Sequence, residues 1–242
     1  MGAFELLRFP DAEYLAKVTA SEWLKELQAI STRDKPFCIA LSGGRIARAF
    51  LSAASTLFRN QNPLRPSVHF FWGDERCVPP NDPESNFLLA NEAFLSPLEV
   101  PTDQVHRIRG EDSPREAVVH AETELRQWAL TSNNGQPILD LVFLGMGEDG
   151  HVASLFPGEP EQMVNNPDLF RSVIASKPTP NRITLGYPAL AAARQIWVLA
   201  SGAGKEIALS ESLSPDGHTP LARLLKLRSH TRVFTDLSSE NI

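Results

Sequence analysis

The chain has 242 residues, of which 42% are apolar and 21% are charged. It carries 23 lysine and arginine residues against 29 aspartate and glutamate residues, so its formal net charge is −6 with histidine neutral. This composition is typical of a globular protein with a large core, and a single domain over residues 1–242 is expected. The negative balance argues against a protein that holds nucleic acid by general electrostatics, because such proteins bind phosphates through clustered cations.

Membrane, secreted and disulfide-stabilised classes are also disfavoured. The longest apolar stretch, 138–146, is interrupted by Asp140 and is far shorter than the roughly 20 residues of a membrane helix. Residues 1–10 show no basic start followed by an apolar core, so no secretory signal is predicted and a cytoplasmic location is expected. Cys38 and Cys77 form no Cys-x-x-Cys pair, and we expect both to be reduced and structural.

Hydrophobic periodicity and turn residues predict that strands and helices alternate. The predicted helices are 11–30, with Asp11 as N-cap, then 46–58, 85–95, 113–130, 188–193 and 205–213. The predicted strands are 37–41, 68–72, 105–108, 138–144, 172–176, 182–185 and 196–200. Most of these strands are apolar throughout, which is typical of strands buried on both faces. The sequence therefore predicts an α/β fold: a mainly parallel sheet flanked by helices on both faces.

Polar loops follow several predicted strands, and in an open parallel sheet ligands bind beyond the carboxyl ends of the strands. These loops are 42–45, 73–76, 145–151 and 201–205. Ser42-Gly43-Gly44 before a helix offers backbone N–H groups to a phosphate or carboxylate, although a tight turn explains it equally well. Arg76 at the rim of the sheet is able to bind a carboxyl or carbonyl oxygen, although a solvated charge cluster is the usual meaning of such a run.

Nucleotide sites are not predicted. Gly204-Lys205 lacks the first glycine and the following Ser or Thr of a P-loop. Gly145-x-Gly147-x-x-Gly150 matches the spacing of a dinucleotide fingerprint, but Pro157-Gly158 ends any following helix within two turns.

The same loop contains the best catalytic pair in the chain. Asp149 lies two residues before His151, and a carboxylate is able to hold an imidazole in one tautomer for general base chemistry near neutral pH. For an isolated Asp-x-His, the alternative is a pair that only satisfies loop backbone groups. The remaining histidines are scattered without metal-ligand spacing, so no metal is expected.

Taken together, these motifs resemble the 6-phosphogluconolactonase family. The similar segments are, in order, 41–44, 71–79 with Asp82, Ser85-Asn86, 144–157, 182–184 and Gly204-Lys205. The resemblance covers about residues 37–235, and the segment that contains Asp149 and His151 is its most specific part. The fold of this family, shared with glucosamine-6-phosphate isomerases, is an α/β sandwich around a mainly parallel sheet.

The resemblance implies hydrolysis of 6-phosphogluconolactone in the pentose phosphate pathway, without a metal or organic cofactor. It implies that His151 takes a proton from water, that Asp149 orients His151, and that Arg76 lies near the lactone. The residues that it implies for substrate and phosphate binding are Ser42, Gly43, Gly44, Asp74, Arg182 and Lys205. Many relatives carry a small hydroxyl residue where this chain has Arg45, which either approaches the phosphate or points to solvent.

Two alternatives to the lactonase stay open. Amino-sugar-phosphate isomerases share the Asp-Gly-His loop, but they usually have Tyr where Arg76 stands and Asn-Glu-Pro after the loop, where this chain has 154–157. A non-catalytic sugar-phosphate sensor needs a DNA-binding segment, and the region before the first predicted strand shows no second helix and little basic charge. We therefore expect a sugar-phosphate lactone as the partner, no nucleic acid or membrane, and a monomer or weak homo-oligomer.

Overall fold

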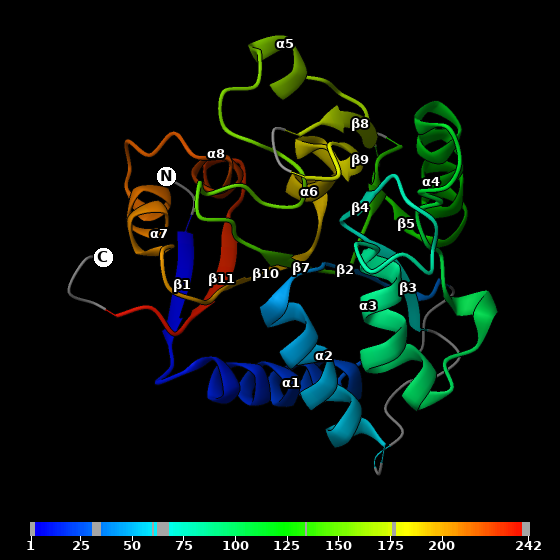
Figure 1. Cartoon of the computed structure of the whole chain (residues 1–242), viewed down its shortest axis with the longest axis horizontal. Coiled ribbons are helices and arrows are strands. Elements are labelled where there is room, and N and C mark those ends of the chain that lie inside the picture. Colours follow the sequence, from blue (N-terminus) through cyan, green and yellow to red (C-terminus); the bar gives the residue numbers. More distant parts are fainter. Residues whose placement is uncertain are drawn as a thin grey trace.

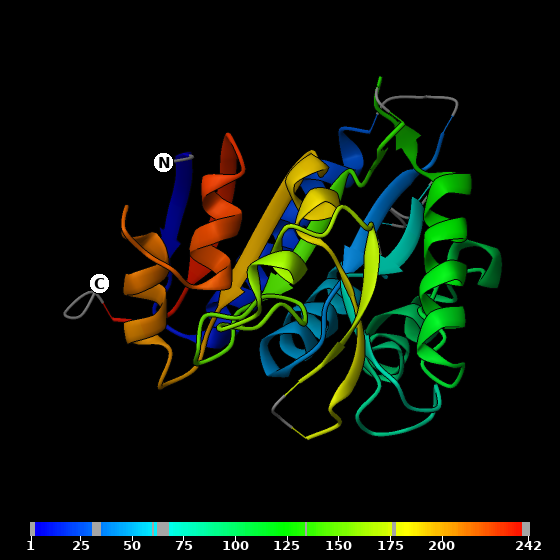
Figure 2. The same ribbon diagram turned by 90° about the horizontal axis from the view of Figure 1, so that it is seen from above.

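The structure is a computed structural model that describes residues 3–30, 35–59, 61, 68–133, 135–175 and 178–238, and within them six strands form the main sheet. The strands are β1 (Ala3–Arg8), β2 (Phe37–Leu41), β3 (Val68–Trp72), β7 (Leu141–Gly145), β10 (Gln195–Ala200) and β11 (His230–Thr235). Their order is β1-β11-β10-β7-β2-β3, and all pairings are parallel. The carboxyl ends therefore share one edge (Figure 2).

Helices cover both faces of this sheet, as the sequence predicts. The α-helices in the described residues are α1 (Ala12–Gln28), α2 (Arg45–Phe58), α3 (Asn86–Ala90), α4 (Pro114–Trp128), α5 (Glu161–Val164), α6 (Tyr187–Ala192), α7 (Glu206–Leu213) and α8 (Pro220–Lys226). Short π and 3-10 turns, η1 (Asn91–Leu95), η2 (Ser96–Leu98) and η3 (Thr102–Gln104), continue the chain after α3. Figure 1 shows α1, α2 and α3 on one side of the sheet and α6 and α8 on the other.

A smaller antiparallel sheet stands beside the carboxyl edge. In the part of the chain that the structure describes, it consists of β4 (Asp74–Arg76), β9 (Asn181–Leu185) and β8 (Phe170–Ile174), in that order. The predicted strand 172–176 thus ends earlier, and Ser176 lies outside the described residues. The predicted polar loop 73–76 mostly forms β4, because its backbone pairs with β9. A further short pair joins β5 (Leu130–Thr131) to β6 (Pro137–Ile138).

The strand predicted at 105–108 is wrong. Val105 forms only an isolated bridge with Phe70, and His106 donates its backbone N–H to the carbonyl of Phe70 at 2.8 Å. The segment follows η3 and leaves the edge of the sheet after this contact, so its apolar residues are buried without a strand ladder. The prediction also missed β1, β11 and α8.

The face of the sheet under α1 and α2 is filled by aromatic rings. Trp23 of α1 is fully buried, and its ring centroid lies 5.1 to 5.4 Å from those of Phe50, Phe58, Phe94 and Phe143. Such pairs contribute about 0.5–1.5 kcal/mol each beyond their burial. Both helices are therefore held firmly against the sheet, which fixes the N-terminus of α2 at the carboxyl edge.

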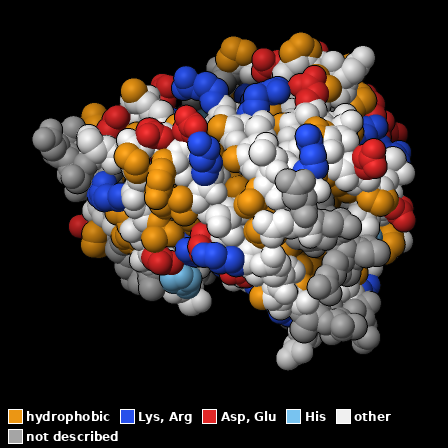
Figure 3. All heavy atoms as spheres, turned by 90° about the horizontal axis from the view of Figure 1, so that it is seen from below, with side chains coloured by type: hydrophobic (Ala, Val, Ile, Leu, Met, Phe, Trp, Pro, Cys, Tyr) orange, Lys and Arg blue, Asp and Glu red, His pale blue; other side chains and the backbone are white. Residues whose placement is uncertain are grey.

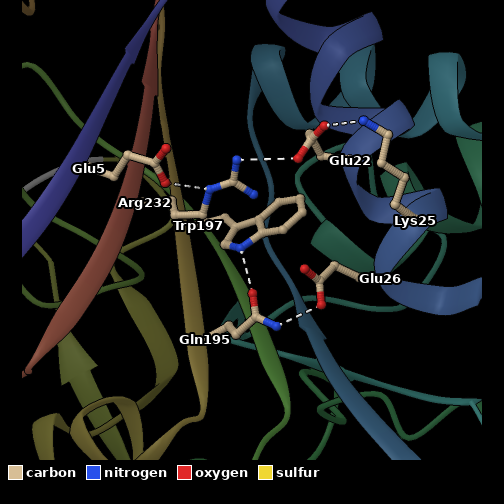
Figure 4. Close-up of polar contacts among 7 residues, drawn as sticks. All are labelled: Glu5, Glu22, Lys25, Glu26, Gln195, Trp197 and Arg232. Atoms are coloured by element: carbon tan, nitrogen blue, oxygen red, sulfur yellow. Dashed lines mark hydrogen bonds and ion pairs between the residues drawn. The ribbon is translucent and has the colours of Figure 1, made fainter. Parts of the chain in front are cut away.

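An ion network beside Trp23 also fastens α1 to the sheet (Figure 4). Arg232 of β11 donates to Glu5 of β1 at 3.0 Å and to Glu22 of α1 at 3.3 Å. Its guanidinium carbon lies 4.9 Å from the ring centroid of Trp197, on β10. One cation of β11 thus joins β1 and α1, near the start of the described chain, to β10, and the aromatic contact adds to ion pairs that alone contribute little at a surface.

The surface over α1 and α2 carries charges of both signs among apolar side chains (Figure 3). The described side chains of this face therefore form no one-sign basic patch of the kind that typically binds a phosphate backbone. None of the described helices combines the length and the hydrophobicity of a bilayer-spanning segment.

Buried histidines lie between β3 and α4, away from the loops at the carboxyl edge. His69 Nδ1 lies 2.8 Å from His106 Nε2, and His106 Nδ1 lies 2.7 Å from Glu124 Oε2. The His69 ring also contacts Trp128, with centroids 4.4 Å apart. Burial, followed by repulsion from His106, lowers the pKa of His69 from 6.5 to about 4. Burial also lowers the pKa of His106, although Glu124 opposes the shift.

These histidines predict acid-sensitive stability. The pKa of His69 is lower in the folded than in the unfolded chain, so the unfolded state binds a proton first as the pH falls. The contribution of neutral His69 is complete above the unfolded pKa of about 6.5 and is lost as the pH falls towards 4. We expect His69→Gln to lose about 2 kcal/mol less free energy of unfolding than wild type between neutral pH and pH 4. Urea titrations at a series of pH values measure the free energy of unfolding of both proteins. An equal fall of this free energy in the two proteins between neutral pH and pH 4 would contradict the prediction.

Candidate active site

The site lies where the direction in which successive strands are added to the sheet reverses. The chain passes from β2 to β3 on one side, whereas β7 lies on the other side of β2. The register of β2 with β7 covers only Ile39 with Leu141 and Ala40 with Val142, so the two strands part before their carboxyl ends. In doubly wound sheets, ligands bind in the crevice at such a switch point.

A cavity of about 140 Å³ opens at this switch point. Its lining comes from the loops after β2, β7 and β10 and from α2, β4, α3 and β9. The lining residues are Ser42, Gly43, Gly44, Arg45, Ile46, Asp74, Arg76, Asn86, Gly145, Met146, Gly147, His151, Ala153, Arg182, Ser201 and Lys205. The four polar loops predicted to share one rim of the sheet thus meet in one cavity.

Asp149 and His151 face each other in the loop after β7. The Oδ1 atom of Asp149 is hydrogen-bonded to His151 Nδ1 and also accepts the backbone N–H of His151 at 3.3 Å. The side chain of His151 is 18% exposed and that of Asp149 is 35% exposed, so the pair is only partly screened by water. With Nδ1–H donating to the carboxylate, Nε2 carries the lone pair that general base chemistry requires.

Glycines allow the close packing of this loop. A Cβ atom at Gly147 would lie 2.0 Å from both Cε1 and Nδ1 of His151, so no other residue fits beside the imidazole. Gly147 also donates its N–H to the His151 carbonyl at 2.9 Å. The loop rests on the N-terminus of α8, where Leu221 donates its N–H to the carbonyl of Gly150 at 3.1 Å.

Arg76 is held on β4 by groups from α3 and the segment before it. Its Nη1 donates to the carbonyl of Glu84 at 2.8 Å and to Asn86 Oδ1. Asn86 is buried, and its amide Nδ2 donates to the carbonyl of Asp74 at 2.9 Å. A Cβ atom at Gly43 would lie 1.8 Å from Asn86 Oδ1, so the loop after β2 packs directly against this amide. Asn86 therefore links Arg76, Asp74 and the β2 loop.

The acidic residues of β4 belong to the scaffold as well as to the cavity. Asp74 is 4% exposed and accepts the Ser154 hydroxyl at 2.6 Å. Glu75 points away from the cavity lining and accepts the backbone N–H groups of Asn86 and Phe87, each at 2.8 Å. Burial raises the pKa of Glu75, while these hydrogen bonds oppose the shift. Glu75 thus caps the N-terminus of α3.

Arg182 reaches the cavity from β9. Its Nε and Nη2 donate to the carbonyls of Thr179 and Pro178, both at 3.1 Å. Burial, followed by repulsion from Arg76, lowers the pKa of Arg182 from its usual range. The two guanidinium groups therefore repel each other, and a bound anion would offset this repulsion.

The opposite part of the lining combines a helix N-terminus with further cations. Gly44 is the N-cap of α2 and has no side-chain cap, so the first backbone N–H groups of α2 border the cavity. Arg45 begins α2, and its Nη2 lies 3.7 Å from the position a Cβ would take at Gly202. Lys205 precedes α7 and lines the same cavity. Arg45 therefore lies at the cavity rim, although it is exposed.

The structure brings the predicted site residues together. All of them line the cavity except Asp149, which lies behind His151 and bonds to it. The prediction did not include Asn86 among the site residues, although the Ser85-Asn86 segment is one of those that resemble the family. It also missed Ser201, whose hydroxyl donates to Asp236 at 2.9 Å.

Comparison with known proteins identifies the family. The family model described as glucosamine-6-phosphate isomerases/6-phosphogluconolactonase matches residues 10–234. The chain belongs to this family. The 6-phosphogluconolactonase of Treponema pallidum is 34% identical over 212 residues, covering 87% of this chain and 84% of the relative. That of Mycobacterium tuberculosis is 32% identical over 209 residues, covering 85% and 84%. These names agree with the resemblance in the sequence.

Solved structures of the family share the whole fold. A crystal structure described as devB protein has a TM-score of 0.85 and 31% identity, and the match covers 96% of each chain. The 6-phosphogluconolactonase from Trypanosoma brucei has a TM-score of 0.78 and 25% identity, covering 97% of this chain and 96% of that one. Two rice proteins named probable 6-phosphogluconolactonase 4, chloroplastic, are 36% identical, and the chain spans 66% of their length.

Gly147→Ala is expected to disturb the Asp149–His151 pair, because the added methyl group would occupy the position of the imidazole. We expect the downfield Nδ1 proton signal of His151 in the NMR spectrum to weaken or disappear. Gly73→Ala is the matched control, because a Cβ there would meet its neighbours at ordinary distances of 3.6 and 3.7 Å. An unchanged His151 signal in Gly147→Ala would show that the loop relaxes around the methyl group.

Proposed function

We propose that this chain hydrolyses 6-phospho-D-glucono-1,5-lactone to 6-phosphogluconate, with His151 as the general base for water. One observation carries the proposal: an imidazole oriented by a carboxylate opens onto the same cavity as several cationic side chains. These cations are Arg45, Arg76, Arg182 and Lys205. The substrate has a carbonyl carbon for the water to attack and a phosphate for the cations to bind, and the names of the curated relatives support this choice.

The reaction follows from the roles of His151 and Arg76. Nε2 of His151 takes a proton from water as the water oxygen attacks the lactone carbonyl, and Asp149 stabilises the imidazolium that forms. The carbonyl oxygen becomes an oxyanion, which Arg76 stabilises through a guanidinium held in place by Glu84 and Asn86. The imidazolium then returns its proton to the ring oxygen as the carbon–oxygen bond breaks. A lactone is an activated ester, so this scheme needs neither a protein nucleophile nor a metal.

Phosphate binding positions the carbonyl for this step. The backbone N–H groups at the start of α2 and the side chains of Arg45, Arg182 and Lys205 offer charge-assisted hydrogen bonds to a phosphate dianion. Binding energy from this remote group orients the reacting carbon and so contributes to the rate, not only to affinity. Asp74, which is bonded to Ser154 and Asn86, also lines the cavity and is assigned to the sugar hydroxyls.

Three assignments remain predictions of the sequence: a cytoplasmic location, a monomer or weak homo-oligomer, and the absence of a nucleic acid or membrane partner. The rice relatives are named chloroplastic, so location differs within the group of relatives. Formation of a ketose phosphate from glucosamine-6-phosphate would instead support the isomerase activity that the family description also contains.

His151→Ala is the central test of the proposed function. Loss of a general base typically costs about 10²–10⁴-fold in rate, so kcat for lactone hydrolysis is expected to fall by that amount. The assay follows acid release from freshly prepared lactone, corrected for spontaneous hydrolysis. His230→Ala, at an exposed histidine that begins β11, is the control and should retain wild-type kcat. Equal rates for His151→Ala and wild type would remove His151 from the mechanism.

Lys205→Ala and Arg182→Ala test the phosphate contacts. Each is expected to cost about 1.5–3 kcal/mol in kcat/KM, the range for hydrogen bonds to charged groups. The loss should be smaller with the unphosphorylated glucono-1,5-lactone, because that substrate has no phosphate for either side chain to bind. A variant with unchanged kcat/KM for the phosphorylated lactone would refute the assignment of its residue.

A further inference from the structure

Phe156 follows the catalytic loop and folds back onto it. Val152 and Leu155 form an isolated antiparallel bridge, and Leu155 donates its N–H to the carbonyl of Val152 at 3.0 Å. This tight turn brings the Phe156 ring against the His151 ring, with centroids 4.8 Å apart and planes tilted by 40°. Phe156 is absent from the cavity lining, so it contacts the base and not the space for substrate.

The turn is fixed by bonds to both strands that carry the cavity arginines. Ser154, which is fully buried, donates its backbone N–H to Thr184 Oγ1 on β9 at 3.1 Å and its hydroxyl to Asp74 on β4 at 2.6 Å. Ala153 adopts a left-handed φ of 50°, a conformation that costs a non-glycine residue of order 1–3 kcal/mol. Such strain persists only where the surroundings dictate it, which the bonds of Ser154 do here.

Phe156 also contacts a cation of the cavity. The guanidinium carbon of Arg182 lies 5.6 Å from the Phe156 centroid, within the range of a cation–π interaction. Two donors of that guanidinium are bound to backbone carbonyls, so its position is set independently of the ring. The ring therefore lies against two groups that are positively charged at the same stage of the proposed reaction, the imidazolium of His151 and Arg182.

The imidazole is thus confined on several sides. Asp149 binds its Nδ1, the backbone of Gly147 leaves no room for a Cβ beside Cε1, and Phe156 covers part of its ring. A hydrogen bond to one ring nitrogen alone leaves the ring able to tilt about that bond. An apolar ring against the imidazole removes this freedom and excludes water from the contact, and its π face attracts the imidazolium once it forms.

We propose that Phe156 is a positioning residue for His151: its ring holds the imidazole in the orientation that Asp149 selects and stabilises the imidazolium. The proposal rests on the proposed lactone hydrolysis for its kinetic test, but its structural part concerns the protein without substrate. It assigns a function to an aromatic residue that is absent from the cavity lining and acts through His151.

The test compares Phe156→Leu with Phe156→Tyr and Phe87→Leu. Leucine keeps an apolar side chain but loses the π face, and tyrosine restores the ring. Phe87 is the matched control, because it is also half-buried and has an arginine, Arg107, at 5.7 Å, but its ring packs against Trp72 and not against His151. We expect kcat of Phe156→Leu to fall roughly 10- to 100-fold with KM changed less than about twofold, as for a misplaced catalytic group. Phe156→Tyr and Phe87→Leu should stay close to wild type.

NMR of the protein without substrate separates this inference from the proposed function. In Phe156→Leu, the ring-current shift of the carbon-bound His151 protons should disappear and the Nδ1 proton signal should weaken, while Phe156→Tyr should preserve both. Wild-type kcat for Phe156→Leu, a loss confined to KM, or an unchanged Nδ1 signal would each overturn the inference. If wild type fails to hydrolyse the lactone, the proposed function fails, and the NMR comparison still decides the role of Phe156.

Discussion

The parting of β2 and β7 at the carboxyl edge is the constraint on which the rest of the site depends. The two strands share only a short register, after which one continues into α2 and the other into the loop with Asp149 and His151. Packing then prevents the gap from closing, because Trp23 and the surrounding aromatic rings hold α2 in place on one side. On the other side, the N-terminus of α8 supports the catalytic loop through Gly150.

Charge is distributed unevenly around this gap. Asp74 and Glu75, the acids nearest to it on β4, are both bonded to neighbouring groups of the scaffold, whereas cationic side chains from four different elements line the cavity. Such an arrangement attracts anions even though the chain as a whole is negative. Net charge thus argues against nucleic acid as a partner but gives no information about the local field, which depends on where each side chain folds.

The sequence predicted the parts of the fold whose signals are local. Buried strands such as β2, β3 and β10 are continuous apolar runs, and the glycine-rich loops after them marked the edge where the site lies. The parts that depend on distant pairing were missed. β1 contains Glu5 and Arg8, and its charges are accommodated because it is an edge strand whose Glu5 pairs with Arg232. β4 is polar and forms because β9 pairs with it. The contacts of Asn86 depend on the loop after β2, where Gly43 packs against the Asn86 side chain.

The position of β1 has a consequence for how the chain acquires its structure. In the main sheet β1 pairs with β11, which lies near the other end of the described residues. The next element after β1 in the sequence, by contrast, is the helix α1. On a ribosome, this edge of the sheet therefore stays open until β11 has emerged. Long-range closure of this kind carries a large entropic cost before any contact repays it and slows folding. Until β11 arrives, the half-apolar β1 has no partner strand, and a chaperone that binds extended apolar segments would be expected to engage it during synthesis.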